Sequence, residues 1–301
     1  MSSSTASETS RITADRDPRP TPPPVRHVPK RSLRYMLLAG CVAAVVWSVW
    51  GTHIGLASLI EGREGAARLI SGLFPPDLGG SLLSRVGTAV AQTVQISIAS
   101  LVLGAIMGLP LAVLMAANVN APGWLSGTAR SIATGLRGVP ELLWGLLFVA
   151  TVGLGPAAGV YAISLHAAGL LAKLCSEQLE AVDPAPVEAM RLTGAGRTAT
   201  ALLAIFPQAR ANIASQLLYQ WECNIRSSVV IGFVGAGGIG QALGIAMKLF
   251  RYQEMATLLI AVLVLVIAVD RISRAFRGRL GAASHMTNRT LIRQLISWSR
   301  R

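Results

Sequence analysis

Two residues of opposite charge lie four positions apart in a long apolar stretch of this chain. They are Glu222 and Arg226, and residues four apart share one face of a helix. A cation in the middle of a membrane span costs about 2.5–3.5 kcal/mol on insertion scales, so such a residue is usually functional. Two interpretations stay open. Arg226 either forms a structural ion pair with Glu222, or faces a pathway in which its guanidinium attracts a phosphate-like oxyanion.

Glu141 is a third charge within apolar sequence, directly after Pro140. For Glu141 we favour a role in structure or gating over contact with a substrate. Lys173 and Glu177 are spaced to pair on one helix face. The three cysteines and four histidines are dispersed, without a Cys-x-x-Cys or a Cys/His cluster. The sequence therefore predicts no disulfide framework, no metal site and no catalytic residue.

Residues 235–240 read Gly-Ala-Gly-Gly-Ile-Gly and satisfy the spacing of a dinucleotide-binding fingerprint. The context excludes that function, because no strand–helix–strand pattern surrounds them and no acidic residue follows about 20 positions later. We expect these glycines to let irregular backbone turn at membrane depth. The residues predicted to form a translocation pathway are Glu141, Glu222, Arg226, Gly235, Gly237 and Gly238. No Gly-Lys dipeptide and hence no Walker A sequence occurs, so any ATP hydrolysis belongs to another chain.

The elements that hold these residues are expected to be membrane helices. Hydrophobic residues make up 52% of the 301 residues and charged residues 14%, which is typical of a membrane protein. Of the 27 lysines and arginines, seven lie in residues 1–34 and eight in residues 271–301, on either side of the apolar body. Basic flanks of this kind mark the cytoplasmic side of spans. They lack interleaved aromatic residues, so we expect no nucleic-acid partner.

Long charge-free runs predict an all-α integral membrane protein with about six spans. The spans are placed at about residues 34–54, 88–117, two between 131 and 176, 211–234 and 255–272. Residues 118–130 are expected to form a loop, and small residues in the second span should let helices pack closely.

The predicted domain organisation has four parts, with both termini in the cytoplasm. Residues 1–32 form a disordered basic tail, and residues 33–84 contain the first span and an extracytoplasmic amphipathic segment. Residues 85–278 form the transmembrane core, and residues 279–301 a basic C-terminal tail.

The segment 183–210 is a polar interruption of the apolar core. An aspartate and two prolines open it as a helix start, and Glu188 is expected in the first turn, near the positive end of the helix dipole. A glycine elbow at Gly194 should precede a second helix over residues 197–206, which Pro207 stops or kinks.

This segment resembles the cytoplasmic coupling loop of ABC importer permeases, whose motif reads E-A-A, three residues, G, nine residues, I, one residue, L-P. The positions that match at the family spacing are Glu188, Ala189, Gly194 and Pro207. Apolar residues replace the other three. A narrower resemblance covers about residues 85–278 and depends most on ECNIRSS followed by GAGGIG. In these residues the chain looks like the permease of phosphonate-type importers, which are related to methionine-importer permeases.

The resemblance implies a type I ABC importer permease in the bacterial cytoplasmic membrane. Its implied partners are a second permease copy in a homodimer, a cytoplasmic ABC ATPase dimer that binds ATP and Mg²⁺, and an extracytoplasmic substrate-binding protein. The chain itself would bind no cofactor and would be a transport subunit, not an enzyme. The implied cargo is phosphonate, phosphite or phosphate, with methionine or another small solute as the alternative.

The resemblance also implies roles for the coupling residues. Glu188 would hold the loop by capping or pairing, Gly194 would permit the elbow, and Pro207 would set the angle at which the fifth span begins. The alternative of another class is an ion-coupled secondary transporter. Such a transporter should show inverted repeats with broken helices, and no segment has a convincing second copy.

Overall fold

The computed structural model describes residues 30–52, 63–119 and 121–280, and it contains no strand among them. The chain divides into two units, Met1–Gly65 and Ala66–Arg301. In the first unit, α1 (Lys30–Gly51) is a helix of 22 residues. A helix is thus confirmed where the first span was predicted. It begins before residue 32, so the last residues of the expected disordered tail are helical.

Most of both predicted tails, residues 1–29 and 281–301, lies outside the described residues, as does the segment 53–62. The predicted amphipathic segment contains α3 (Arg63–Leu73), an 11-residue helix. The first residues of the predicted C-terminal tail, Arg279 and Leu280, are the end of α12 (Tyr252–Leu280).

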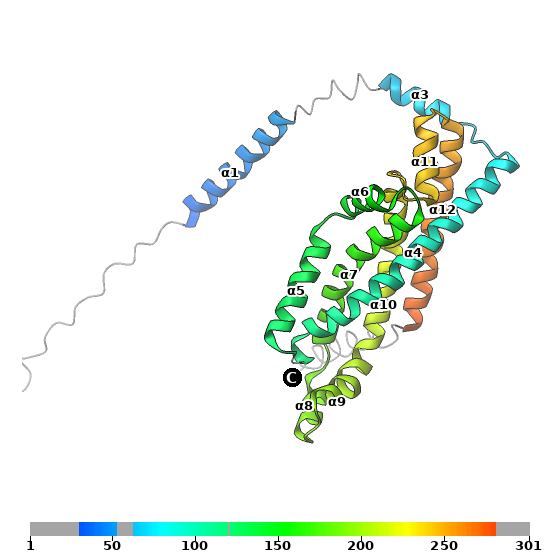
Figure 1. The fold of residues 1–301 in the computed structure, drawn as a ribbon. Helices are drawn as coiled ribbons and strands as arrows, with labels where there is room; N and C mark the ends of the chain where they lie inside the picture. The colour runs from blue at the N-terminus through cyan, green and yellow to red at the C-terminus, as the bar shows by residue number, and fades with distance from the viewer. Residues whose placement is uncertain (1–29, 53–62, 120, 281–301) are drawn as a thin grey trace, which may run out of the picture. The chain divides into compact units, whose positions relative to one another are not determined.

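The second unit is a bundle of helices that run between two ends (Figure 1). Besides α12, its long helices are α4 (Gly80–Met115), α7 (Pro156–Glu180) and α10 (Phe206–Gly232). Shorter ones are η1 (Ala117–Val119), α5 (Gly123–Gly138), α6 (Glu141–Val152), α8 (Pro184–Leu192), α9 (Arg197–Thr200), the π-helical η2 (Ala201–Ile205) and α11 (Gly238–Lys248). The predicted loop 118–130 is wrong in its second half, because α5 already begins at Gly123.

The described residues contain three helices long and apolar enough to cross a membrane: α4, α7 and α12. The pair α5 and α6 becomes a fourth candidate if its two arms, bent by 84°, count as one span. The predicted number of six is not reached by this criterion, since the apolar part of α1 is short and α10 is too polar. The predicted break at Gly153 and Gly155 is confirmed, but the stretch before it bends at Pro140, where proline ends the hydrogen-bond ladder of α5.

α7 lies at the centre of the bundle and packs against α4, α5, α6 and α10. Its buried face consists largely of small residues, so neighbouring backbones approach closely. A Cβ on Gly108 of α4 would lie 2.7 Å from the carbonyl oxygen of Ala168. A Cβ on Gly169 would lie 2.7 Å from the amide nitrogen of Arg137 on α5. The close packing predicted from small residues is therefore confirmed.

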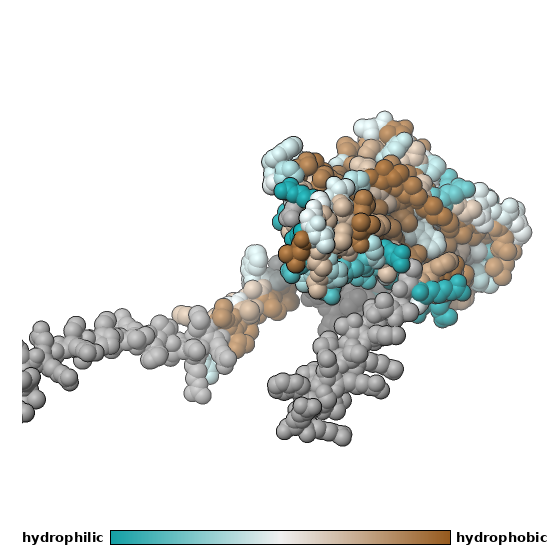
Figure 2. Space-filling model, turned by 90° about the horizontal axis from the view of Figure 1, so that it is seen from below, coloured by the Kyte–Doolittle hydropathy of each residue, from teal (hydrophilic) through white to brown (hydrophobic). Residues whose placement is uncertain are grey.

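Apolar side chains also cover the outside of the second unit. Figure 2 shows brown apolar residues at the surface in many places, seen from the end that carries α8 and α9. On α4 and α12 these include Val102, Ile106, Leu263 and Val264, each at least half exposed. Exposed apolar faces of this extent suit helices whose surroundings are lipid.

Candidate functional site

α8 and α9 form a helical elbow at one end of the bundle (Figure 1). Asp183 caps α8, because its side-chain Oδ1 accepts a hydrogen bond of 3.0 Å from the amide of Ala185. Glu188 is the fifth residue of the helix that begins at Pro184, so its predicted place in the first turn is wrong. The residue that caps the helix is Asp183, more than a turn earlier. Its carboxylate accepts from one of the backbone N–H groups that a helix start leaves without a partner.

Gly194 forms the predicted elbow between these two helices. Its φ is +79°, a conformation that residues with a Cβ rarely adopt, and no heavy atom lies within 4 Å of where its Cβ would be. Glu188 and Ala189 lie exposed on α8, and among the described residues Glu188 has no hydrogen bond or ion pair. Within the described part of the chain, Glu188 therefore neither caps nor pairs, and its role in holding the loop stays a prediction. Its carboxylate is available to another chain.

Pro207 does not end the second helix. α9 continues through the π-helical turn of η2 directly into α10, with Pro207 in the first turn of α10. The ring of a proline clashes with the carbonyl four residues earlier, and the wider π turn over residues 201–205 relieves this clash without breaking the helix. The elbow is thus continuous with the long helix α10.

The elbow is anchored on the bundle by an apolar cluster and by hydrogen bonds. Val187 of α8 and Ile205 of η2 are buried against Leu179, at the end of α7. The Arg191 guanidinium donates a 2.8 Å bond to the carbonyl oxygen of Asn118. The outer side remains free, and Leu192 is 89% exposed. A force applied to this outer side would be transmitted to α7 and α10.

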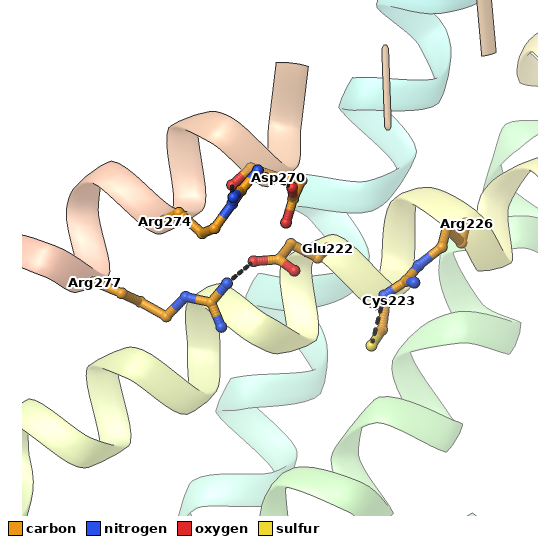
Figure 3. Close-up of polar contacts among 6 residues, drawn as sticks. All are labelled: Glu222, Cys223, Arg226, Asp270, Arg274 and Arg277. Carbon is orange, nitrogen blue, oxygen red and sulfur yellow. Dashed lines mark hydrogen bonds and ion pairs between the residues drawn. The ribbon is translucent and has the colours of Figure 1, made fainter. Parts of the chain in front are cut away.

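The second group of predicted residues lies where α10 faces α12 (Figure 3). Glu222 of α10 pairs with Arg277 of α12 at 2.5 Å, and their side chains are 11% and 28% exposed. On α12, Asp270 pairs with Arg274, also at 2.5 Å. The structural pair considered for Glu222 and Arg226 is therefore wrong, because α12 brings another arginine to Glu222. The predicted pair Lys173–Glu177 is confirmed at 2.9 Å.

Arg226 lies at mid-depth of the bundle. Its neighbours Trp221 and Asn224 bond to α4, where Trp221 Nε1 donates to Ser97 Oγ at 3.2 Å and Asn224 Nδ2 donates to Ser100 Oγ at 3.2 Å. Ser97 is halfway along the 36 residues of α4. Arg226 itself is exposed, and its Nη2 lies 3.7 Å from Cys223 Sγ.

Glu141 is the first residue of α6 and lies next to this group. Ser227, which follows Arg226 on α10, donates a hydrogen bond of 2.5 Å from its Oγ to Glu141 Oε2. The bond ties the bend between α5 and α6 to α10. This contact fits the structural or gating role favoured for Glu141.

Gly235, Gly237 and Gly238 form a buried turn between α10 and α11, with φ values of +98°, +84° and +68°. The predicted irregular turn is confirmed. A Cβ on Gly235 would lie 2.1 Å from Leu154 Cδ2, and one on Gly237 would lie 3.3 Å from Pro156. Two of the three glycines therefore pack against the break between α6 and α7.

Gly238 starts α11 and borders a hollow between α11 and α4 of about 360 Å³. Its amide donates to Gln92 Oε1 at 2.8 Å, and the next amide, of Ile239, donates to Thr93 Oγ1 at 2.9 Å. These bonds satisfy donors that a helix start leaves free. Gln92 and Thr93 were not predicted from the sequence, where their signal is two adjacent polar residues within an apolar run.

The family of this chain is shown by a match to a known protein family. The family described as the inner membrane component of binding-protein-dependent transport systems matches residues 108–281, more than half of the chain. The chain belongs to this family. It is therefore a permease subunit and not an enzyme, and permeases of this family work with an ATPase and a binding protein.

Permeases from two other organisms are similar to this permease over most of its length. The phosphite transport system permease protein PtxC of Stutzerimonas stutzeri is 36% identical over 244 residues, which are 80% of this chain and 86% of the relative. The phosphate-import permease protein PhnE of Mycolicibacterium smegmatis is 33% identical over 264 residues, which are 88% of this chain and 49% of the relative.

Solved structures agree on the fold. The permease is 21% identical to a chain of the MetNI methionine ABC transporter in an inward-facing conformation, with a TM-score of 0.61 over 67% of this chain and 99% of the other. An amino acid ABC transporter is 20% identical, with a TM-score of 0.54 over 75% of this chain and 99% of the other. At this identity the likeness shows the ABC importer permease fold alone.

Replacing Glu222 by glutamine in this permease should destabilise it more than replacing Asp270 by asparagine. Glu222→Gln leaves the half-buried Arg277 without its carboxylate, which should cost about 2 kcal/mol. Asp270→Asn removes a carboxylate from a pair that is 42% and 57% exposed, which should cost less than about 0.5 kcal/mol. Thermal unfolding of the detergent-purified variants measures both. Equal melting temperatures for the two variants would contradict the assignment of Glu222 as the carboxylate partner that the half-buried Arg277 needs.

Proposed function

We propose that this permease carries phosphorus oxyanions (phosphate, phosphite or phosphonates) across the membrane. The observation that supports this cargo most is the 36% identity to a phosphite transport permease over most of both chains. The phosphate-import relative supports the same class. The resemblance to methionine and amino acid transporters is confined to the fold, so it does not favour methionine over a phosphorus oxyanion as the cargo.

The proposed partners would bind at the two ends of the second unit. A cytoplasmic ATPase dimer, which holds ATP and Mg²⁺, would bind the outer side of the elbow, where Glu188 and Leu192 are exposed. A second copy of this permease would complete the path, and an extracytoplasmic binding protein would deliver the anion at the opposite end. With the elbow in the cytoplasm, α12 runs toward the cytoplasm, because Leu265 packs with Ile225 and Arg277, further along α12, pairs with Glu222 nearer the elbow. We place the N-terminus in the cytoplasm as well, because of its basic residues.

The test is uptake by proteoliposomes that contain this permease, its ATPase and its binding protein. Labelled phosphate, phosphite, methylphosphonate and methionine are offered outside, with ATP or a non-hydrolysable analogue inside. Uptake of a phosphorus oxyanion that needs ATP hydrolysis is the expected result. Uptake of methionine alone would overturn the cargo, and uptake without ATPase would overturn the whole proposal.

A further inference from the structure

The charges between α10 and α12 do not balance. The group contains the carboxylates of Glu222 and Asp270 and the guanidinium groups of three arginines (Figure 3). Each carboxylate already has an arginine at 2.5 Å, Arg277 for Glu222 and Arg274 for Asp270. Arg226 is left over, and the group carries a net charge of +1.

Arg226 has little compensation from its surroundings. Among the described residues its hydrogen-bond partner is the Cys223 sulfur at 3.7 Å, which is a weak acceptor. The guanidinium borders a cleft of about 130 Å³ between α10 and α12. Four apolar residues line this cleft, together with Glu222 and Asp270, whose carboxylates are each already paired with an arginine of α12. An arginine at mid-depth of a membrane protein without a carboxylate partner is costly unless it faces water or an anion.

A polar stripe on α10 leads to Arg226. Its residues recur at alternating spacings of four and three, so they lie on one face of the helix, and each is exposed or half-buried: Asn212, Gln216, Tyr219, Cys223 and Arg226. The stripe is about 21 Å long, at 1.5 Å per residue. The end of the stripe at Asn212 is nearest the elbow, since the next residue, Ile213, packs in the cluster that anchors the elbow. A polar face of this length faces water or protein in preference to lipid.

We propose that Arg226 is an oxyanion-binding residue of the translocation path, and that the stripe below it lines the water-filled route to the elbow end. This inference rests on the proposed function. A guanidinium presents a planar fork of N–H donors that matches two oxygens of a tetrahedral phosphorus oxyanion. The weak sulfur contact leaves these donors available, and the exposure of Arg226 lets the anion leave again.

The experiment compares initial uptake rates in proteoliposomes that contain the complete importer. Arg226→Ala should lower uptake of the transported phosphorus oxyanion about tenfold or more, as expected for the loss of a charge-assisted bidentate contact. Arg226→Lys keeps the charge but loses the planar fork of N–H donors. Its uptake rate should lie between those of the wild type and Arg226→Ala. The matched control is Arg271→Ala, which removes an exposed arginine from the neighbouring helix α12 and should change uptake less than about twofold.

A second measurement uses the wild-type complex and needs no variant to fold. Cys223 should react with N-ethylmaleimide, and its modification is followed by mass spectrometry of its peptide. Millimolar phosphate should slow this reaction, whereas chloride at equal ionic strength should not. Unchanged labelling in phosphate, or wild-type uptake by an Arg226→Ala complex, would overturn the role of Arg226. If the wild-type importer moves no phosphorus oxyanion at all, the proposed function fails instead.

Discussion

Gly240→Ala should remove most of the folded permease from the membrane. Gly240 is in the first turn of α11, where this helix crosses the end of α10. A Cβ at this position would lie 2.0 Å from the carbonyl oxygen of Val229 and 3.0 Å from the Cα of Gly232. These are backbone atoms within two rigid helices, so neither side can move away without separating α10 from α11. Overpacking against backbone should cost at least about 3 kcal/mol.

The amount of folded Gly240→Ala protein is measured by size-exclusion chromatography of detergent-solubilised membranes and by its melting temperature. Gly127→Ala is the matched control, because Gly127 is also helical but has no heavy atom within 4 Å of its Cβ position. This control should be neutral or slightly stabilising, since alanine is the better helix former. A Gly240→Ala protein as stable as the Gly127→Ala protein would contradict the close crossing of α10 and α11.

Much of the local backbone could be predicted because the signals were local. A glycine after a short helix predicts an elbow, and Gly194 adopts the required positive φ. A run of glycines in apolar sequence predicts an irregular turn, and Gly235, Gly237 and Gly238 form one. The capped start of α8 follows from Asp183 and the proline after it. In each case the residue type restricts its own backbone, so no knowledge of distant residues was needed.

The pairing of charges could not be predicted, because it depends on how distant helices pack. Four-residue spacing placed Glu222 and Arg226 on one helix face, but the sequence could not show that α12 brings Arg277 to Glu222 across 55 positions. The same limit applies to Ser227 and Glu141, which bond across 86 positions. The geometry that makes Arg226 a candidate site therefore emerged only from the tertiary structure.

The helix end considered at Pro207 was wrong for a related reason. Pro207 was expected to stop or kink a helix, but the chain instead widens into the π turn of η2, whose Ala204 and Ile205 are buried in the anchoring cluster. Burial of these side chains on the bundle favours a continuous helix over a break at the proline. Packing therefore decided against the helix end that was one of the two effects predicted for Pro207.

Gly194→Asp should leave the permease folded in the membrane but abolish coupled transport. The φ of +79° imposes strain of about 1 kcal/mol on aspartate, which adopts left-handed backbone more readily than most residues with a Cβ. Nothing lies within 4 Å of the Cβ position, so no clash within this chain should prevent folding. The strain is instead relieved by a shift of α8 relative to α9, which moves the exposed side of the elbow away from the position that the ATPase would bind.

Gly196→Asp separates the effect of the backbone from the effect of the added charge. Gly196 lies two residues further along the same elbow, has nothing within 4 Å of its Cβ position and has a φ of −64°, so aspartate fits there without strain and can cap α9. Co-purification of the ATPase and ATP-driven uptake should therefore survive in Gly196→Asp and be lost in Gly194→Asp. Loss of both activities in both variants would assign the effect to the negative charge. Normal uptake by Gly194→Asp would show that the elbow geometry does not transmit the work of the ATPase, and the force would then have to reach α10 through its π turn alone.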